Sequence, residues 1–282
     1  MCAGGHESAS VTTRDEDLLA AERALQQRAQ LSFAAARQAG LPGLFETHDL
    51  DGLFAVLTTS PGLSFLNSIT GVTSASLDAL PRALEVFAAA NAPGPSIGTA
   101  PWSPASVSRR LEQLGFEPAG ERPLAYLKCP AARPESDQPI GEWAVHEAGD
   151  VGELDLFIRI LLAGYASDPR VCVHRRRAPR TRRPPFRCLA RRSPLAAAGL
   201  SQHGDSLVIG GAGTLPEARG AGAQSELLRY RVRIAGEQNV HMAVATCAPK
   251  TPSARNLQRA GFSIIERRAW RHVCVNHCRA MS

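Results

Sequence analysis

Two glycines at the start of a predicted helix are the residues of this sequence whose spacing best suits chemistry. Gly220 and Gly222 lie in the segment 213–224, and residues 225–235 follow with apolar side chains at helical spacing. Glycine lets the main chain turn tightly and approach a ligand closely, so N–H groups at the helix start can point at a phosphate. The helix macrodipole adds to the same attraction. The pattern predicts an anion-binding turn, although two glycines alone would also suit an ordinary helix start.

The elements expected around this turn favour the phosphate interpretation. Residues 206–213 form an apolar, β-prone run that predicts a buried strand entering the turn, and residues 240–246 predict a second strand. Residues 253–262 predict a short helix, with Ser253 as its N-cap and Gly261 as its C-terminal stop. The expected order is therefore strand, glycine turn, helix, strand, short helix and strand.

This order of parts resembles the GNAT superfamily of N-acetyltransferases. Residues 219–224, Arg-Gly-Ala-Gly-Ala-Gln, stand where that family has its acyl-CoA pyrophosphate loop, and residues 256–262 resemble its second motif. The family has a small residue at the place of Gln224, so five of six positions match. The resemblance covers residues 141–271 and implies an α/β (α+β) fold with a mixed central sheet flanked by helices.

The resemblance also implies a function. The chain is expected to move an acetyl group from acetyl-CoA to a primary amine, of a small molecule or a peptide, by direct transfer in a ternary complex without a metal. A main-chain N–H between residues 213 and 215 would polarise the acyl carbonyl. The expected cofactor-binding residues are Leu215, Arg219, Gly220, Ala221, Gly222, Ala223, Gln224 and Asn256. A non-catalytic acyl-CoA-binding scaffold is the alternative.

A Rossmann dinucleotide loop is the competing phosphate interpretation. It fits less well, because its third glycine would stand at residue 225, which is Ser225.

The sequence does not identify the catalytic acid or base. Many relatives place a tyrosine where this chain has Leu257. Glu217, His203 and His241 are the nearest candidate bases by chain position, and Cys247 is better explained as a small buried residue than as a nucleophile. We therefore assign no catalytic residue from the sequence.

The length of 282 residues and a polar, proline-containing stretch at 131–140 predict two domains joined by a linker. Residues 141–282 would form the acetyltransferase domain. Residues 1–130 would form a degenerate GNAT-like domain, because Leu111–Phe116 mirrors Leu257–Phe262.

Within that first domain we expect a helix over 13–39, strands over 53–57 and 63–69, and a helix over 77–90. Residues 71–76 stand at the place of the glycine turn without its Arg-x-x-Gly-x-Gly pattern, so this half should not hold acyl-CoA. It would either line the acceptor pocket or serve as a scaffold.

The formal charge of +6 has a local origin. Ten of the 32 basic residues are arginines within residues 170–192, and the rest of the chain has fewer basic residues than the 26 acidic ones. This proline-broken segment is predicted to be irregular, and an arm for nucleic acid is a less favoured function for it. No Asp or Glu occurs from Pro169 to Gly204, so translation from a shifted frame is a further hypothesis, which translation of the gene in all three frames tests.

The seven cysteines form no Cys-x-x-Cys pair, which favours reduced thiols and a cytoplasmic location. The tail residues His272, Cys274, His277 and Cys278 could bind zinc, but no second ligand pair accompanies them, so we expect no metal. No run of about 20 apolar residues predicts a membrane span.

Overall fold

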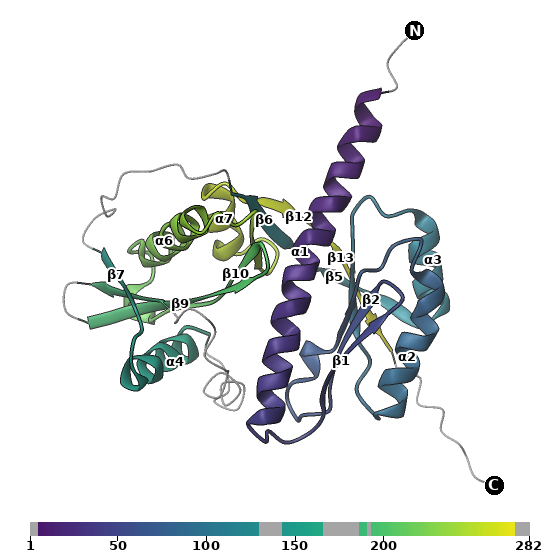
Figure 1. Cartoon of the computed structure of the whole chain (residues 1–282), viewed down its shortest axis with the longest axis horizontal. Helices are drawn as coiled ribbons and strands as arrows, with labels where there is room; N and C mark the ends of the chain where they lie inside the picture. The colour runs from purple at the N-terminus through teal and green to yellow at the C-terminus, as the bar shows by residue number, and fades with distance from the viewer. Residues whose placement is uncertain (1–4, 130–142, 166–185, 191–192, 274–282) are drawn as a thin grey trace. The chain divides into compact units, whose positions relative to one another are not determined.

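The computed structural model describes residues 5–129, 143–165, 186–190 and 193–273. The chain forms two compact units, each with a mixed sheet flanked by helices (Figure 1). The unit that contains the glycine turn, called here the loop unit, comprises residues 1–36 and 124–265. The companion unit comprises residues 37–123 and 266–282. The predicted fold class of mixed sheets with flanking helices is confirmed.

The sheet of the loop unit has the strand order β12-β6-β11-β10-β9-β8-β7. Only β10 and β11 pair in parallel, and all other neighbours are antiparallel. Its strands are β6 (Leu124–Lys128), β7 (Trp143–Glu147), β8 (Phe186–Ala190), β9 (Ser193–His203), β10 (Ser206–Thr214), β11 (Met242–Thr246) and β12 (Ser263–Ile265). Its helices are α4 (Val151–Tyr165), α6 (Ala223–Glu237), α7 (Pro252–Arg259) and most of α1 (Gly5–Gln38).

Helices cover both faces of this sheet. Ala196 and Ala198 of β9 pack into the core under α6, whereas the intervening Ala197 packs against α4. Successive side chains of a strand point to opposite faces, so each β9 residue serves one of the two cores. On β10, Leu207 and Ile209 also pack under α6. Burying each such leucine or isoleucine contributes about 2 kcal/mol.

The companion unit repeats this arrangement. Its strand order is β1-β2-β3-β4-β13-β5, and again one inner pair, β3 and β4, is parallel while the other neighbours are antiparallel. Its strands are β1 (Phe45–Leu50), β2 (Leu53–Thr58), β3 (Ser68–Thr70), β4 (Ser96–Thr99), β5 (Phe116–Glu121) and β13 (Arg268–His272). Its helices are α2 (Leu80–Ala89) and α3 (Ala105–Gln113).

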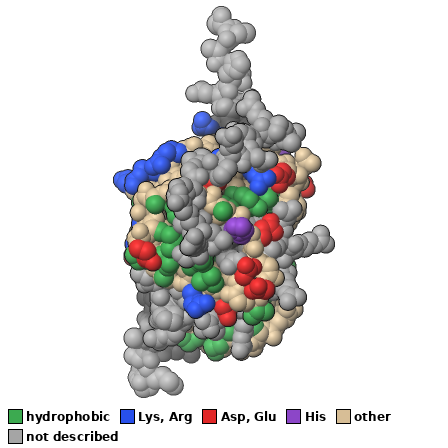
Figure 2. Space-filling model, turned by 90° about the vertical axis from the view of Figure 1, so that its left-hand side faces the viewer, with side chains coloured by type: hydrophobic (Ala, Val, Ile, Leu, Met, Phe, Trp, Pro, Cys, Tyr) green, Lys and Arg blue, Asp and Glu red, His purple; other side chains and the backbone are tan. Residues whose placement is uncertain are grey.

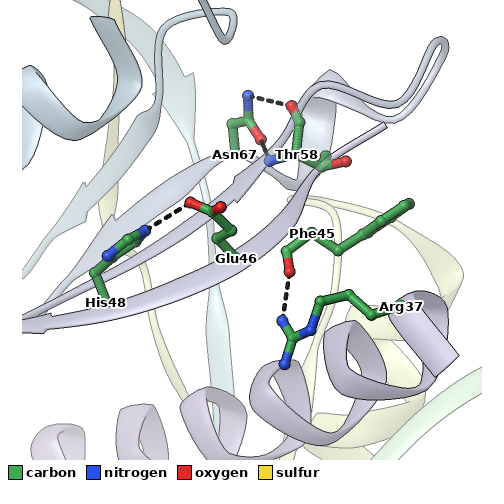
Figure 3. Close-up of polar contacts among 6 residues, drawn as sticks. All are labelled: Arg37, Phe45, Glu46, His48, Thr58 and Asn67. Carbon is green, nitrogen blue, oxygen red and sulfur yellow. Dashed lines mark hydrogen bonds and ion pairs between the residues drawn. The ribbon is translucent and has the colours of Figure 1, made fainter. Parts of the chain in front are cut away.

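A buried asparagine joins β2 to the segment that leads into β3 (Figure 3). The side chain of Asn67 accepts the N–H of Thr58 at 2.7 Å and donates to the carbonyl oxygens of Thr58 and Pro93. At the start of the unit, the guanidinium of Arg37 donates to the carbonyl of Phe45. These bonds satisfy buried main-chain groups where the chain enters and leaves the sheet.

Each sheet contains one strand from the other half of the sequence. Strand β6 lies between β11 and β12 of the loop unit, and β13 lies between β4 and β5 of the companion unit. The compact units are therefore not the contiguous halves 1–130 and 141–282 that the sequence suggests. The predicted linker at 131–140 lies outside the described residues, and its role stays a prediction.

Several elements differ locally from the sequence expectation. Residues 63–69, predicted as a strand, contain a 3-10 turn (Ser64–Leu66) before the short β3. The N-cap of α7 is Thr251, whose Oγ1 accepts the N–H of Ala254 at 3.3 Å, and Ser253 lies inside the helix. Within the arginine-rich segment, residues 186–190 form β8, and the remainder lies outside the described residues.

Candidate functional site

The glycine turn has the conformation that its sequence predicts. After β10, a 3-10 turn (Pro216–Ala218) leads to Gly220 with φ of 80° and Gly222 with φ of 89°. Both values lie in the left-handed region that favours glycine. Gly222 is the N-cap of α6, and the helix begins with the bond from Glu226 N–H to the Gly222 carbonyl.

The turn presents a row of main-chain donors. Among the described residues, no hydrogen bond is donated by the main-chain N–H groups of residues 220–225. The first N–H groups of a helix have no intrahelical acceptor, and together with the positive end of the helix dipole they suit an anion. Arg219 to Gly222 are solvent-exposed, so a ligand can reach the turn.

Next to the turn, β10 and β11 separate. Their parallel pairing runs from Ser206 with Met242 to Ile209 with Ala245, whereas β10 continues to Thr214. The register of β10 against β9 shifts between Gly210 and Ala212, so a bulge lies where the pairing with β11 ends. A bulge bends the strand, which accounts for the divergence.

Helix α4 lies directly on the separated part of β10. A Cβ on Gly164 would lie 2.7 Å from Cα of Gly213 and 2.8 Å from N of Thr214. A Cβ on Gly213 would likewise lie 3.1 Å from the carbonyl oxygen of Ile160. Glycine at both positions therefore permits this close approach of helix and strand.

At the end of β10, some main-chain N–H groups bond within the sheet and others point toward the space where β10 and β11 have separated. The N–H of Leu215 donates to the carbonyl of Leu195 at 2.9 Å, so it is used within the sheet. Consecutive N–H groups of a strand point to opposite sides, which directs the N–H of Thr214 away from β9. Leu215, predicted to bind the cofactor, would thus have to contact a ligand through other atoms.

Gln224, where the sequence departs from the family motif, spans the turn. Its Nε2 donates to the carbonyl oxygen of Gly213 and to Oγ1 of Thr214, both at 2.8 Å. The side chain thus connects the first turn of α6 to the end of β10. Its side-chain nitrogen makes these bonds without using the N–H groups of the turn, for which the described residues supply no acceptor, as the phosphate interpretation requires.

The guanidinium of Arg219 lies at the C-terminal end of α4. Its Nη2 donates to the carbonyl of Gly164 at 3.2 Å, where the negative end of the helix dipole favours a cation. This bond holds a positive charge beside the glycine turn.

Helix α7 places the second predicted motif. Leu257 is buried in the core under α6 with an exposed fraction of 4%, so its position is one of packing. Asn256 is half-buried, and its carbonyl accepts the N–H of Ala260 near the end of the helix. Gly261 has φ of 89° and ends the helix as predicted.

Two of the candidate bases lie at the wrong end of the sheet. His203 pairs with Ser206 and His241 precedes β11, whereas the strands separate beyond Ile209. The eight strand residues from Ser206 to Gly213 span about 23 Å, so neither histidine is near the end of β10 where the strands have separated. Glu217, in the 3-10 turn before Arg219, is the candidate that lies beside the glycine turn.

Cys247 follows β11 directly and packs half-buried against the core. Burial raises the pKa of its thiol, so the thiol is protonated at neutral pH. It is therefore a packing residue rather than an activated nucleophile, as the sequence suggests.

His203 gives the stability of the loop unit a pH dependence. Burial, and then the positive charge of Arg28, lower its pKa from 6.5 to about 4. Between these values the unfolded chain binds the proton and the folded chain does not, so we expect stability to fall as the pH decreases from 6.5 to 4. Thermal unfolding of the wild type and His203→Gln over this range should show the steeper loss in the wild type, and parallel curves would contradict the assignment.

In the corresponding turn of the companion unit, residues 71–76, a side chain of the turn bonds to main-chain groups of the same turn. Ser76 Oγ accepts the N–H of Thr73 at 2.9 Å and donates to the carbonyl of Gly71 at 2.8 Å. Asp78 lies in the first turn of the following 3-10 helix (Leu77–Ala79), where a carboxylate disfavours a phosphate. That the first half does not hold acyl-CoA stays a prediction.

Sequence reasoning missed one residue that contacts the turn. Trp143, at the start of β7, donates its Nε1–H to the carbonyl oxygen of Ala221 at 2.8 Å. The two residues are 78 positions apart, and a single tryptophan before a short strand gives no signal of such a bond.

Figure 2 shows one face of the molecule, on which described basic side chains gather at the upper left, while acidic and apolar side chains are interspersed over the rest of the face. Within the described residues no group of three His, Cys, Asp or Glu side chains could hold a metal. Residues 274–278 of the tail lie outside the description. Every helix in the described part of the chain is too short or too polar to cross a bilayer.

Comparisons with solved structures identify proteins that have a similar fold. No family model and no curated protein matches the sequence. A GCN5-related N-acetyltransferase from Kribbella flavida is 16% identical with a TM-score of 0.59, over 86% of this chain and 95% of that one. A GCN5-related N-acetyltransferase from Sphaerobacter thermophilus is 14% identical with a TM-score of 0.60, over 78% of this chain and 76% of that one.

A third solved structure also matches the presence of two sheets in the chain. A tandem GNAT protein from the clavulanic acid biosynthesis pathway is 12% identical with a TM-score of 0.52, over 91% of this chain and 95% of that one. Its likeness extends over both units described above. The chain therefore has a GNAT-like fold, built as two tandem units.

Proposed function

We propose that the loop unit binds acetyl-CoA and transfers its acetyl group to a primary amine. One observation carries this proposal: the N–H groups of residues 220–225 have no acceptor within the described chain, at a turn beside separated parallel strands. The turn would hold the diphosphate, and the gap between β10 and β11 would take the thioester arm. Arg219 adds a positive charge at the same place.

The chemistry follows from placing an amine against the thioester carbonyl. A thioester reacts with a neutral amine without a protein nucleophile, so proximity and orientation supply much of the acceleration. The N–H of Thr214, directed away from β9, would donate to the acyl oxygen as negative charge develops there. The amine attacks the acyl carbon, the carbon–sulfur bond breaks, the amine nitrogen loses one proton, and the thiolate of CoA gains one.

The acceptor would be a small-molecule or peptide amine. A non-catalytic acyl-CoA-binding protein is the second candidate, favoured by the buried Leu257 at the position where many relatives have a tyrosine. Glu217 is the base that we propose to test first, because it lies beside the turn. A cytoplasmic location stays a prediction.

Calorimetry with acetyl-CoA tests the binding, and release of free CoA with a panel of amines tests the transfer. We expect saturable binding and release that depends on one class of amine. Binding without release for any amine would favour the scaffold, and no binding would refute the proposal.

A further inference from the structure

Trp143 connects the edge of the loop unit's sheet to the glycine turn. Its Nε1–H donates to the carbonyl oxygen of Ala221 with an N···O distance of 2.8 Å. A Cβ on Gly222 would lie 3.8 Å from the same nitrogen. The indole also packs against the core under α6, which fixes the ring that makes the bond. The bond thus joins a packed side chain to the exposed main chain of the turn.

This bond sets the orientation of one peptide group. The carbonyl of Ala221 and the N–H of Gly222 belong to the same trans peptide, so they point in opposite directions. Because the Ala221 carbonyl accepts the indole N–H of Trp143 and therefore points toward the indole, the N–H of Gly222 points away from it. It is one of the donors for which the described chain supplies no acceptor.

The same bond limits the start of α6. In a regular helix the N–H of Ser225 would donate to the carbonyl of Ala221, four residues earlier. Here that carbonyl accepts from Trp143, and the helix begins with the bond from Glu226 to Gly222. The helix thus begins at the left-handed Gly222, and the Ala221 carbonyl before it bonds to Trp143. Within the described part of the chain, the N–H of Ser225 is therefore also a donor without an acceptor.

We propose that Trp143 is a positioning residue for the diphosphate of the acyl donor. It acts through the peptide between Ala221 and Gly222 and keeps two N–H groups available to phosphate oxygens. This inference rests on the proposed function and adds to it a residue outside both sequence motifs. It makes the strength of diphosphate binding depend on the edge strand β7.

The test compares Trp143→Phe with the wild type. Phenylalanine keeps an aromatic ring against α6 and removes the N–H donor. Calorimetry measures binding of acetyl-CoA and of S-acetylpantetheine, which has the same thioester arm without the nucleotide diphosphate. We expect the Kd of acetyl-CoA to rise about fivefold to tenfold, as for loss of one hydrogen bond, and the Kd of S-acetylpantetheine to stay unchanged. Trp102→Phe, in the companion unit, is the matched control and should change neither.

The outcomes separate this inference from the function on which it rests. If the wild type and Trp143→Phe bind acetyl-CoA equally well, the positioning role is wrong and the proposed function stands. Equal weakening of both ligands would show that Trp143 only supports the fold, which also overturns the role. If the wild type does not bind acetyl-CoA, both proposals fail.

Discussion

Gly220→Asp should weaken binding of acetyl-CoA by about 100-fold or more. Gly220 has φ of 80°, and a Cβ there would meet no atom within 4 Å, so the side chain itself has room. The carboxylate would stand among the N–H groups that we assign to the diphosphate. Two like unit charges about 6 Å apart at an effective dielectric constant of about 20 repel by roughly 3 kcal/mol, which corresponds to about 100-fold in affinity. Calorimetry with acetyl-CoA measures the change.

Two matched variants isolate the charge from the backbone strain. Gly220→Asn has the same shape and the same φ requirement without the charge, and asparagine tolerates a left-handed conformation, so a loss of no more than about tenfold is expected. Gly120→Asp adds the same residue on β5 of the companion unit, where φ is 89° and a Cβ again meets no atom within 4 Å. It should leave the affinity unchanged. Equal affinities of Gly220→Asp and Gly220→Asn would place the diphosphate elsewhere.

The parts of the site that the sequence predicted are those with local causes. The apolar run ending at Thr214 forms β10, and the glycines at 220 and 222 take positive φ before α6. The echo between the two halves is also local. Helix α3 is followed by Gly115 with φ of 81° and the buried Phe116, as α7 is followed by Gly261 and Phe262. These patterns fix conformation over a few residues, whatever the rest of the chain does.

The parts that the sequence did not predict depend on distant partners. The run Leu124–Lys128 indicates a strand. The sequence does not say which sheet this strand enters, because side chains alternate between the two faces in every strand. The contact of Trp143 with Ala221 likewise needs the sheet in place before the two residues meet. Helix α1 was assigned to the first half, yet residues 1–36 group with the loop unit. One of its contacts there is the ion pair between Asp17 and Lys128 at 2.8 Å.

This exchange of strands predicts that neither half of the chain folds alone. A fragment of residues 136–282 lacks β6, so β12 loses the strand with which it pairs and β11 becomes an edge. A fragment of residues 1–135 lacks β13 and the side chain of Trp270, which is 1% exposed and donates to Thr99 Oγ1 at 3.1 Å. Truncation of a buried tryptophan alone costs about 3–5 kcal/mol, against a total stability of about 5–15 kcal/mol for a typical domain.

Each fragment should therefore show no cooperative thermal unfolding, whereas the two expressed together should copurify and bind acetyl-CoA. The control is the full chain with a protease site inserted in 131–140 and cut after folding. It should keep a Tm close to that of the uncut protein, because the exchanged strands hold their places once folded. Cooperative unfolding of either fragment by itself would mean that the missing strand is dispensable. The exchange would then link two domains that fold independently, instead of completing their sheets.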